Sequence, residues 1–421
     1  MKILFLIVFL FGYNYAYSQT ETDAKMGEII NSGNLFQLKR QYPLLKDSVS
    51  MRMLNLIAEA QLGIGFNRLE SAATALDSLL QFHQDALGTE GAIGMAALRA
   101  MNLLNMGLYR QGGDAGKDLV NALKEKVPVE SLYSFIFMER VGKALSDQPA
   151  PYLKRPAYDV VVPMRYDTAG RGKLIYIPVE VNGITKEYVF DTGCSFGNFV
   201  SEKYAEEVGL KIVADSIPVG GINIGFVKLA VADSLKVGEI IYYNPVFMIA
   251  PPDKQVDSLF TFNGILGYHF IRDIKEIIID NKSGSFIFPC QLSNGETNMY
   301  LSSNIPNLQI EYNGKAFDLI FDTGNAKSSL GTKFAQLFPK LLSGLPEHSV
   351  RLGGFAGIYQ SKTVVLPRFH FQLSGTPITL HDIDVSKESN KDQFGSLGTD
   401  FIMSFKQVTI NYDSMFVRCA P

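Results

Sequence analysis

The chain has 421 residues, of which 47% are hydrophobic and 19% are charged, and its formal net charge is −3. This length predicts two or three domains, and the apolar content is typical of a globular protein. The small net charge and the absence of a long run of like charges argue against a nucleic-acid partner.

The first residues have the pattern of a secretory signal peptide over 1–18. Lys2 precedes an apolar run over 3–11, and Ala16 and Ser18 place small residues at the −3 and −1 positions of a cut before Gln19. This run is too short to span a membrane, and no later stretch reaches the roughly 18 apolar residues of a transmembrane segment. We therefore expect export to the periplasm or the extracellular space; the alternative is a buried N-terminal helix or strand.

Residues 22–147 are predicted to be helical. Apolar residues recur at spacings of three and four over 49–62, 69–80, 92–106, 115–123 and 129–145. Gly65 and Gly107, like Arg68 and Arg110, are 42 residues apart, which indicates repeated helical hairpins. The pattern resembles a tetratricopeptide-like repeat domain with a longer period. Such a stack either binds an extended protein partner in its groove or only packs against the next domain.

Residues 148–157 are predicted to form a linker. Pro149, Pro151 and Pro156 lie there among polar residues, and proline breaks helices and stiffens a connection. The period of the apolar pattern then changes to two, which predicts an all-β domain after the linker.

Two β-hairpins are predicted in this domain, and each ends on the same three residues. Strands over 173–181 and 186–190 flank the turn Asn182–Gly183, and strands over 308–312 and 316–321 flank Asn313–Gly314. Short helices are expected over 201–208 and 332–337. The triplets that end the hairpins are Asp191-Thr192-Gly193 and Asp322-Thr323-Gly324.

The two triplets belong to a longer repeat with a constant offset. Asp191 and Asp322 are 131 residues apart, and so are Gly267 and Gly398, with further identities between them. One offset kept over so many identities predicts a duplicated β unit, with one half over 158–292 and the other over 298–421. A pseudo-twofold axis would bring the equivalent loops together.

Two facing carboxylates can hydrolyse a peptide bond without a metal or a nucleophilic side chain. Close like charges cannot both ionise, so the pair shares one proton. The ionised member then acts as general base on a water, and the protonated member polarises the amide carbonyl. The glycine after Asp-Thr permits a close backbone approach, and each threonine hydroxyl can donate to the other loop.

These features resemble the retropepsin-like and pepsin-like aspartic proteases, with bacterial secreted members closest, over roughly residues 160–419. The resemblance implies a bilobal all-β fold with pseudo-twofold duplication, which follows the all-α region. It also implies a secreted aspartic endopeptidase that acts on peptides or unfolded proteins and needs no cofactor or metal. Because both halves lie in one chain, a monomer is expected to be active. The resemblance implies that Asp191 and Asp322 are the catalytic dyad, supported by Thr192, Gly193, Thr323 and Gly324. It also implies flaps at Gly220, Gly221, Ile222, Gly353, Gly354 and Phe355, and packing behind the dyad by Ile265, Leu266, Gly267, Leu397 and Gly398.

Three residues depart from the family pattern. Cys194 and Asn325 follow the triplets where Ser, Thr or Ala is usual, and neither side chain is expected to support the aspartate as a hydroxyl does. Ser396 replaces an aliphatic residue and is expected to weaken the support of the second loop. The segment Asp167-Thr168-Ala169-Gly170 looks similar to the triplets but is interpreted as a turn.

Alternative functions stay open at the level of sequence. The chain could be a non-catalytic peptide-binding protein on the same fold, each aspartate could merely cap a turn, or Cys194 could be a nucleophile if a histidine lies nearby. Cys290 and Cys419 end equivalent segments and could form a disulfide or remain free thiols. The five histidines are scattered, which argues against a metal site.

Overall fold

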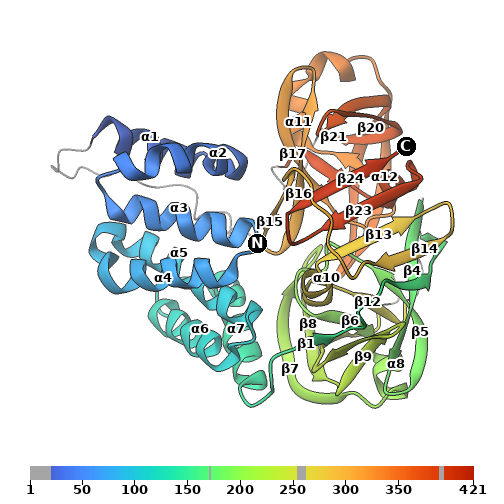
Figure 1. Ribbon diagram of the computed structural model, residues 1–421, viewed down its shortest axis with the longest axis horizontal. Helices are drawn as coiled ribbons and strands as arrows, with labels where there is room; N and C mark the ends of the chain where they lie inside the picture. The colour runs from blue at the N-terminus through green and yellow to red at the C-terminus, as the bar shows by residue number, and fades with distance from the viewer. Residues whose placement is uncertain (1–19, 170–171, 254–261, 388–392) are drawn as a thin grey trace. The chain divides into compact units, whose positions relative to one another are not determined.

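The computed structural model describes residues 20–169, 172–253, 262–387 and 393–421 (Figure 1). The predicted signal peptide lies outside these residues. The chain divides into two compact units, Met1–Ala150 with Ile217–Val219, and Pro151–Ser216 with Gly220–Pro421. The first is mostly helical and the second is mostly β, which confirms the predicted succession of a helical and a β-rich region.

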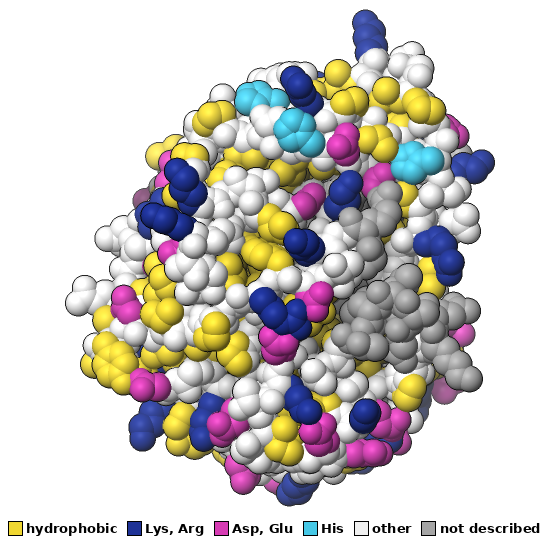
Figure 2. All heavy atoms as spheres, turned by 90° about the vertical axis from the view of Figure 1, so that its right-hand side faces the viewer, with side chains coloured by type: hydrophobic (Ala, Val, Ile, Leu, Met, Phe, Trp, Pro, Cys, Tyr) yellow, Lys and Arg dark blue, Asp and Glu magenta, His cyan; other side chains and the backbone are white. Residues whose placement is uncertain are grey.

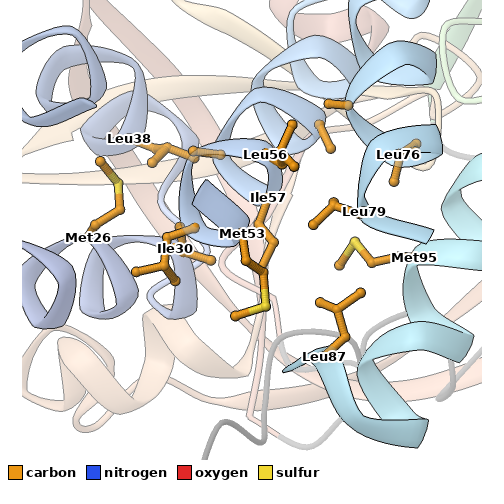
Figure 3. Packing of buried hydrophobic residues seen from close by; sticks show 14 of the residues in the cluster. Met26, Ile30, Leu38, Met53, Leu56, Ile57, Leu76, Leu79, Leu87 and Met95 are labelled. Atoms are coloured by element: carbon orange, nitrogen blue, oxygen red, sulfur yellow. The ribbon is translucent and has the colours of Figure 1, made fainter. Parts of the chain in front are cut away.

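The helical unit is a succession of antiparallel helices (Figure 1). The first helix begins with a capping box, in which Thr20 and Asp23 satisfy each other's backbone N–H groups. Apolar side chains from the first five α-helices form one buried cluster, which includes Met26, Ile57 and Leu79 (Figure 3). The helices are α1 (Glu21–Asn31), α2 (Leu35–Leu45), the short η2 (Lys46–Ser48), α3 (Arg52–Gly65), α4 (Leu69–Phe82), α5 (Gln84–Asn105), α6 (Tyr109–Leu123) and α7 (Val129–Leu145).

Glycines let α6 and α7 approach each other at backbone distance. A Cβ atom on Gly142 would lie 2.6 Å from the carbonyl oxygen of Tyr109 and would overlap the backbone of Gly113. A Cβ atom on Gly116 would lie 2.7 Å from the backbone nitrogen of Glu139. The contact between these two helices therefore depends on residues without side chains.

The first sheet of the β-rich unit contains the first Asp-Thr-Gly triplet. Its elements are β1 (Tyr152–Lys154), β3 (Arg165–Ala169), β4 (Gly172–Val181), β5 (Ile184–Phe190), β6 (Asn198–Ser201), β7 (Lys211–Gly220), β8 (Ile224–Val231), β9 (Ser234–Val237), β10 (Ile240–Tyr243), β11 (Val246–Ala250) and β12 (Gly264–Leu266), with helices α8 (Glu202–Glu207) and α10 (Tyr268–Ile274). The strand order is β1-β10-β9-β4-β5-β12-β6-β11-β8-β7, and β3 pairs with β4. Asn182 and Gly183 join β4 to β5 with positive φ angles, as a tight hairpin requires.

The second sheet contains the second triplet. Its elements are β15 (Met299–Ser302), β16 (Ile305–Tyr312), β17 (Lys315–Phe321), β18 (Ser329–Leu330), β19 (Glu347–Gly354), β20 (Gly357–Leu373), β21 (Thr376–Ser386) and β22 (Gly395–Leu397), with α11 (Thr332–Leu337), η3 (Pro339–Leu342) and α12 (Thr399–Met403). The strand order is β15-β16-β17-β22-β18-β21-β20-β19, with an added pairing of β16 and β20. The turn of its central hairpin is Asn313–Gly314, again with positive φ angles.

A third sheet joins the two halves of the β-rich unit. It contains β2 (Val160–Pro163), β13 (Glu276–Asp280), β14 (Ser285–Phe288), β23 (Gln407–Asn411) and β24 (Phe416–Ala420), in the order β2-β14-β13-β23-β24. The antiparallel pairing of β13 with β23 connects residues that are far apart in the sequence. Each half ends in a hairpin, β13–β14 or β23–β24.

Two local expectations differ from the structure. The strand β1 lies within the predicted linker and pairs with β10, where the ring of Tyr152 stacks on Tyr243 at 4.8 Å. Asp167 lies in β3, not in a turn, because Arg165 binds its carboxylate and the strand pairs with β4. Both strands are short edge segments with little apolar alternation, so the periodicity of the sequence does not reveal them.

The surface carries both signs of charge. Figure 2 shows Lys and Arg side chains interspersed with Asp and Glu side chains over the visible face, as the small net charge leads one to expect. Among the described residues, no helix combines the length and the apolar character that crossing a membrane requires.

Replacing Gly142 by Ala is expected to lower the free energy of unfolding of the helical unit by about 1–3 kcal/mol, because the added methyl group must push α6 away from α7. Gly27 is the matched control, since a Cβ atom there meets nothing within 4 Å and Ala is favoured over Gly inside a helix by about 0.5–1 kcal/mol. Urea unfolding of the full chain, monitored by the circular dichroism signal of its helices, measures the free energy of unfolding of both variants. An equal effect of the two substitutions would contradict the close approach.

Candidate active site

Each aspartate stands directly after a strand and is held there by a neighbouring parallel strand. β12 pairs with β5, and the N–H of Asp191 donates to the carbonyl oxygen of Leu266 at 3.2 Å. β22 pairs with β17 in the same way, and the N–H of Asp322 donates to the carbonyl oxygen of Leu397 at 3.0 Å. Leu266 and Leu397 are buried, as are Gly267 and Gly398, whereas Ile265 is partly exposed. Both aspartates thus start from rigid β structure.

The two triplets lie against each other. A Cβ atom on Gly193 would overlap the carboxylate of Asp322, and a Cβ atom on Gly324 would lie 2.5 Å from the carboxylate oxygens of Asp191. Each carboxylate therefore occupies the space that the opposite glycine leaves free. Glycine is required at both positions by this contact, while the backbone itself needs no left-handed conformation there.

The two threonines exchange hydrogen bonds across the pair of loops. Thr192 Oγ1 donates to the carbonyl oxygen of Phe321 at 2.7 Å and accepts the N–H of Thr323 at 3.0 Å. Thr323 Oγ1 donates to the carbonyl oxygen of Phe190 at 2.8 Å and accepts the N–H of Thr192 at 3.0 Å. Both threonine side chains are fully buried, so these four bonds fix the loops without competition from water.

Burial and charge act on the aspartates together. Burial raises the pKa of Asp191 well above its usual range, and the neighbouring charge of Asp322 raises it further. The N–H of Gly193, which donates to Asp191 Oδ1 at 2.7 Å, opposes this shift but does not reverse it. The pair is therefore suited to hold one proton at a pH where two isolated carboxylates would both be ionised.

The residues after the triplets differ from each other. Asn325 Nδ2 donates to Asp322 Oδ2 at 2.9 Å, so this amide supports its aspartate with an N–H in place of the usual hydroxyl. The buried thiol of Cys194 faces the carbonyl oxygens of Phe196 and Gly197, at 4.0 and 3.8 Å. Burial raises the pKa of this thiol, with Asp191 adding to the effect, so Cys194 is a poor nucleophile.

Side chains that the sequence analysis did not single out support the closing glycines. The N–H of Gly267 donates to Asn198 Oδ1 at 3.2 Å, and the N–H of Gly398 donates to Ser328 Oγ at 2.9 Å. Asn198 and Ser328 are 130 residues apart, so the constant offset of 131 does not align them. Ser396 is buried with its Oγ 3.3 Å from Ser329 Oγ, and β22 keeps its pairings with β17 and β18. The predicted weakening of the second loop by Ser396 is therefore not apparent in the strand pairing.

The predicted flap residues lie at two hairpin tips that touch. Gly220 and Gly221 are at the tip between β7 and β8, and Gly353 and Gly354 end β19 before the tip to β20. The N–H of Ile222 donates to the carbonyl oxygen of Phe355 at 2.9 Å.

Further contacts join the two tips and extend to β6. Asn223 Nδ2 donates to the carbonyl oxygen of Ala356 at 3.0 Å. The ring of Phe355 also lies 5.5 Å from that of Phe199 in β6. Phe355 therefore reaches from the second half of the β-rich unit to the strand that follows the first triplet.

The three cysteines are free, so no disulfide joins Cys290 to Cys419. Among the described residues, no group of three or more His, Cys, Asp or Glu side chains is arranged to hold a metal ion.

Comparison with protein families supports a relationship to aspartic proteases. An aspartyl protease family model matches residues 177–270, which include the first triplet and the unit Ile265–Gly267. The second triplet lies outside the matched residues. The search of curated proteins gives no match.

Three solved structures illustrate the more distant likenesses. Conglutin gamma from lupine seeds is 11% identical over 63% of this chain and 94% of its own, with a TM-score of 0.37. Basic 7S globulin from soybean is 11% identical over 62% of this chain and 96% of its own, also with a TM-score of 0.37. A retropepsin-like aspartic protease from Rickettsia conorii is 16% identical over 33% of this chain and 90% of its own, with a TM-score of 0.22.

Replacing Thr192 by Val keeps the shape of the side chain but removes its hydroxyl. The buried carbonyl of Phe321 and the N–H of Thr323 then lose a partner, and we expect a loss of about 2–4 kcal/mol in the free energy of unfolding. The matched control is Thr185→Val at an exposed position of β5, where the change should stay within about 0.5 kcal/mol. Urea unfolding of the full chain measures the loss of free energy of unfolding in each variant. Similar losses in Thr192→Val and Thr185→Val would show that the hydrogen bonds between the two threonines contribute little to stability.

Replacing Gly221 by Ala is expected to separate the two hairpin tips, because the new methyl group would overlap the carbonyl oxygen of Phe355. Gly354→Ala is the matched control, since a Cβ atom there lies an ordinary 3.5 Å from the side chain of Ile222. Hydrogen exchange of the Ile222 amide should accelerate in Gly221→Ala and change little in Gly354→Ala. Unchanged exchange in both variants would mean that the tips do not stay in contact in solution.

Proposed function

We propose that this protein is an aspartic endopeptidase, in which Asp191 and Asp322 activate a water molecule for attack on a peptide bond. The observation that carries this proposal is the pair of carboxylates, each seated against the glycine of the other triplet. The raised pKa of Asp191 supports it, since a shared proton makes one carboxylate a general base and the other a general acid.

The exposure of the pair supports the proposal that a peptide substrate reaches it. The two aspartates are half-buried, so they are dry enough for a shifted pKa and still accessible to a reacting group. The hairpin tips at Ile222 and Phe355 are proposed to act as two flaps that cover a bound peptide. No metal or cofactor is required in this chemistry.

We also propose that the β-rich unit arose by duplication around a pseudo-twofold axis, giving a bilobal protease within one chain. Thr192 and Thr323, which exchange equivalent hydrogen bonds, are 131 residues apart. Ile278 and Thr409, which pair in the sheet that joins the halves, are also 131 residues apart. Equivalent residues that meet each other in this way are expected on a twofold axis. Both carboxylates would come from one chain, so a monomer would be complete.

The N-terminal sequence supports the further proposal that the protein is exported, as secreted bacterial members of the family are. The helical repeats are proposed to resemble tetratricopeptide hairpins and to offer a surface for a protein partner.

Asp191→Asn and Asp322→Asn test the activity one at a time. Each substitution keeps the shape of the side chain but removes a group that must gain or lose a proton, and we expect the rate of peptide cleavage to fall by about 10²–10⁴-fold or more. The assay is digestion of an unfolded protein between acidic and neutral pH in the presence of a chelator. Cleavage that persists in both variants would refute the dyad. Absence of cleavage by the unaltered chain, with unchanged peptide affinity in both variants, would favour a non-catalytic peptide-binding protein.

The stability of Asp191→Asn provides a readout that does not depend on activity. Because the pKa of Asp191 is raised in the folded chain, ionising this group costs stability as the pH rises through that value. Asp191→Asn removes the cost, so its melting temperature should exceed that of the unaltered chain at neutral pH and approach it at acidic pH. A pH-independent difference would show that the pair does not share a proton.

A further inference from the structure

The two aspartates receive different support at their second carboxylate oxygen. Their Oδ1 atoms are equivalent, because the N–H of Gly193 donates to Asp191 at 2.7 Å and the N–H of Gly324 donates to Asp322 at 3.0 Å. At Oδ2 the equivalence ends. Asn325 donates to Asp322, whereas the thiol of Cys194 faces backbone carbonyls of Phe196 and Gly197. The backbone N–H of Cys194 donates to the carbonyl oxygen of Asp191 at 3.4 Å, and it lowers the pKa of the Asp191 carboxyl less than burial and the charge of Asp322 raise it.

An amide at position 325 acts differently from a hydroxyl. Its nitrogen faces Asp322 Oδ2, so in this orientation the side chain offers a donor to the carboxylate. An amide N–H can only donate, so it favours the ionised form of the carboxylate that it contacts. A hydroxyl could rotate, so it could donate to the ionised carboxylate or accept the hydrogen bond of the protonated one.

We infer that Asn325 is a positioning residue that places the single proton of the pair on Asp191 and keeps Asp322 ionised. Asp322 is then the general base and Asp191 the general acid. This inference rests on the proposed function and assigns the two roles, which the near-symmetry of the triplets by itself leaves equivalent.

The other titratable groups near the pair do not disturb this assignment. Cys194 adjoins Asp191, and Tyr412 faces it from the second half of the unit, next to Tyr268. Burial raises the pKa of all three groups, so they remain neutral over the working range. The charge that varies at this site is that of the aspartates themselves.

The assignment gives a balanced reaction. Water passes one proton to Asp322 as its oxygen bonds to the carbonyl carbon, and Asp191 passes its proton to the carbonyl oxygen, which forms a tetrahedral diol. Asp322 then gives its proton to the amide nitrogen as the C–N bond breaks. Asp191 regains a proton from a diol hydroxyl as the new carboxylic acid forms. The starting distribution of protons is restored.

The pH profile of kcat/KM in the full chain tests the role of Asn325. Activity needs Asp322 ionised, so Asn325→Ala should move the acidic limb to higher pH by about 1 unit, the value for a solvent-exposed hydrogen bond to a charged group. Asn325→Ser, which restores a donor, should recover part of this shift. The control Cys194→Ala removes the equivalent side chain at Asp191 and should leave the acidic limb in place. An unmoved limb in active Asn325→Ala, or an equal shift in Cys194→Ala, would overturn the inference.

A measurement without substrate separates this inference from the proposed function. In a chain labelled with ¹³C at the aspartate carboxyl carbons, the two signals can be assigned with Asp191→Asn and Asp322→Asn. We expect the Asp322 signal to change in the titration step at lower pH and the Asp191 signal to change in the step at higher pH. In Asn325→Ala, the pH interval between the two steps should become smaller. The reverse order overturns the inference even if the protein is active. The expected order in a protein that cleaves no peptide overturns only the proposed function.

Discussion

The hydrogen bonds that Thr192 and Thr323 exchange with the opposite triplet are the constraint on which the candidate site depends. Each hydroxyl bridges to the end of a strand, at Phe321 or Phe190, and to the backbone N–H of the other threonine. These bonds are buried, so breaking one leaves polar groups without water to replace the partner. This exchange and the glycines beside it fix the separation of the two carboxylates. The pKa of Asp191 is raised first by burial and then by the charge of Asp322 at that separation.

The joining sheet supports the same arrangement from further away. β13 and β23 pair over five residues, and Glu276 is buried beside this pairing with 1% of its surface exposed. Its carboxylate accepts hydrogen bonds from Ser293 and from Asn411, which lies opposite it in the register. A buried carboxylate with several donors requires both partner segments to be in place. The halves are therefore connected by polar groups of defined geometry as well as by apolar packing.

Departures from symmetry make the surroundings of the two aspartates chemically different. The triplets, the strands before them and the parallel strands beside them are closely equivalent, and such a pair has no reason to favour a proton on either member. Asn325 and Cys194 differ in chemistry and in orientation, which makes the two carboxylates unequal. The two hairpin tips are also unequal, since Phe355 reaches Phe199 while Ile222 lies over Gly354.

The sequence by itself determined the elements whose signals are local or repeated. Helical periodicity, the Asn-Gly turns, the triplets and the constant offset identified the helices, the central hairpins and the pairing of Asp191 with Asp322. Only the tertiary structure decided which atoms meet. Three features depend on side-chain directions and on loops where the offset changes: the donor at Asp322, the supports at Asn198 and Ser328, and the contact of the two hairpin tips. A hydrogen bond needs its donor and acceptor to be about 3 Å apart, so a shift of one residue or a change of one rotamer is enough to form or break it. A periodic pattern in the sequence does not predict such small displacements.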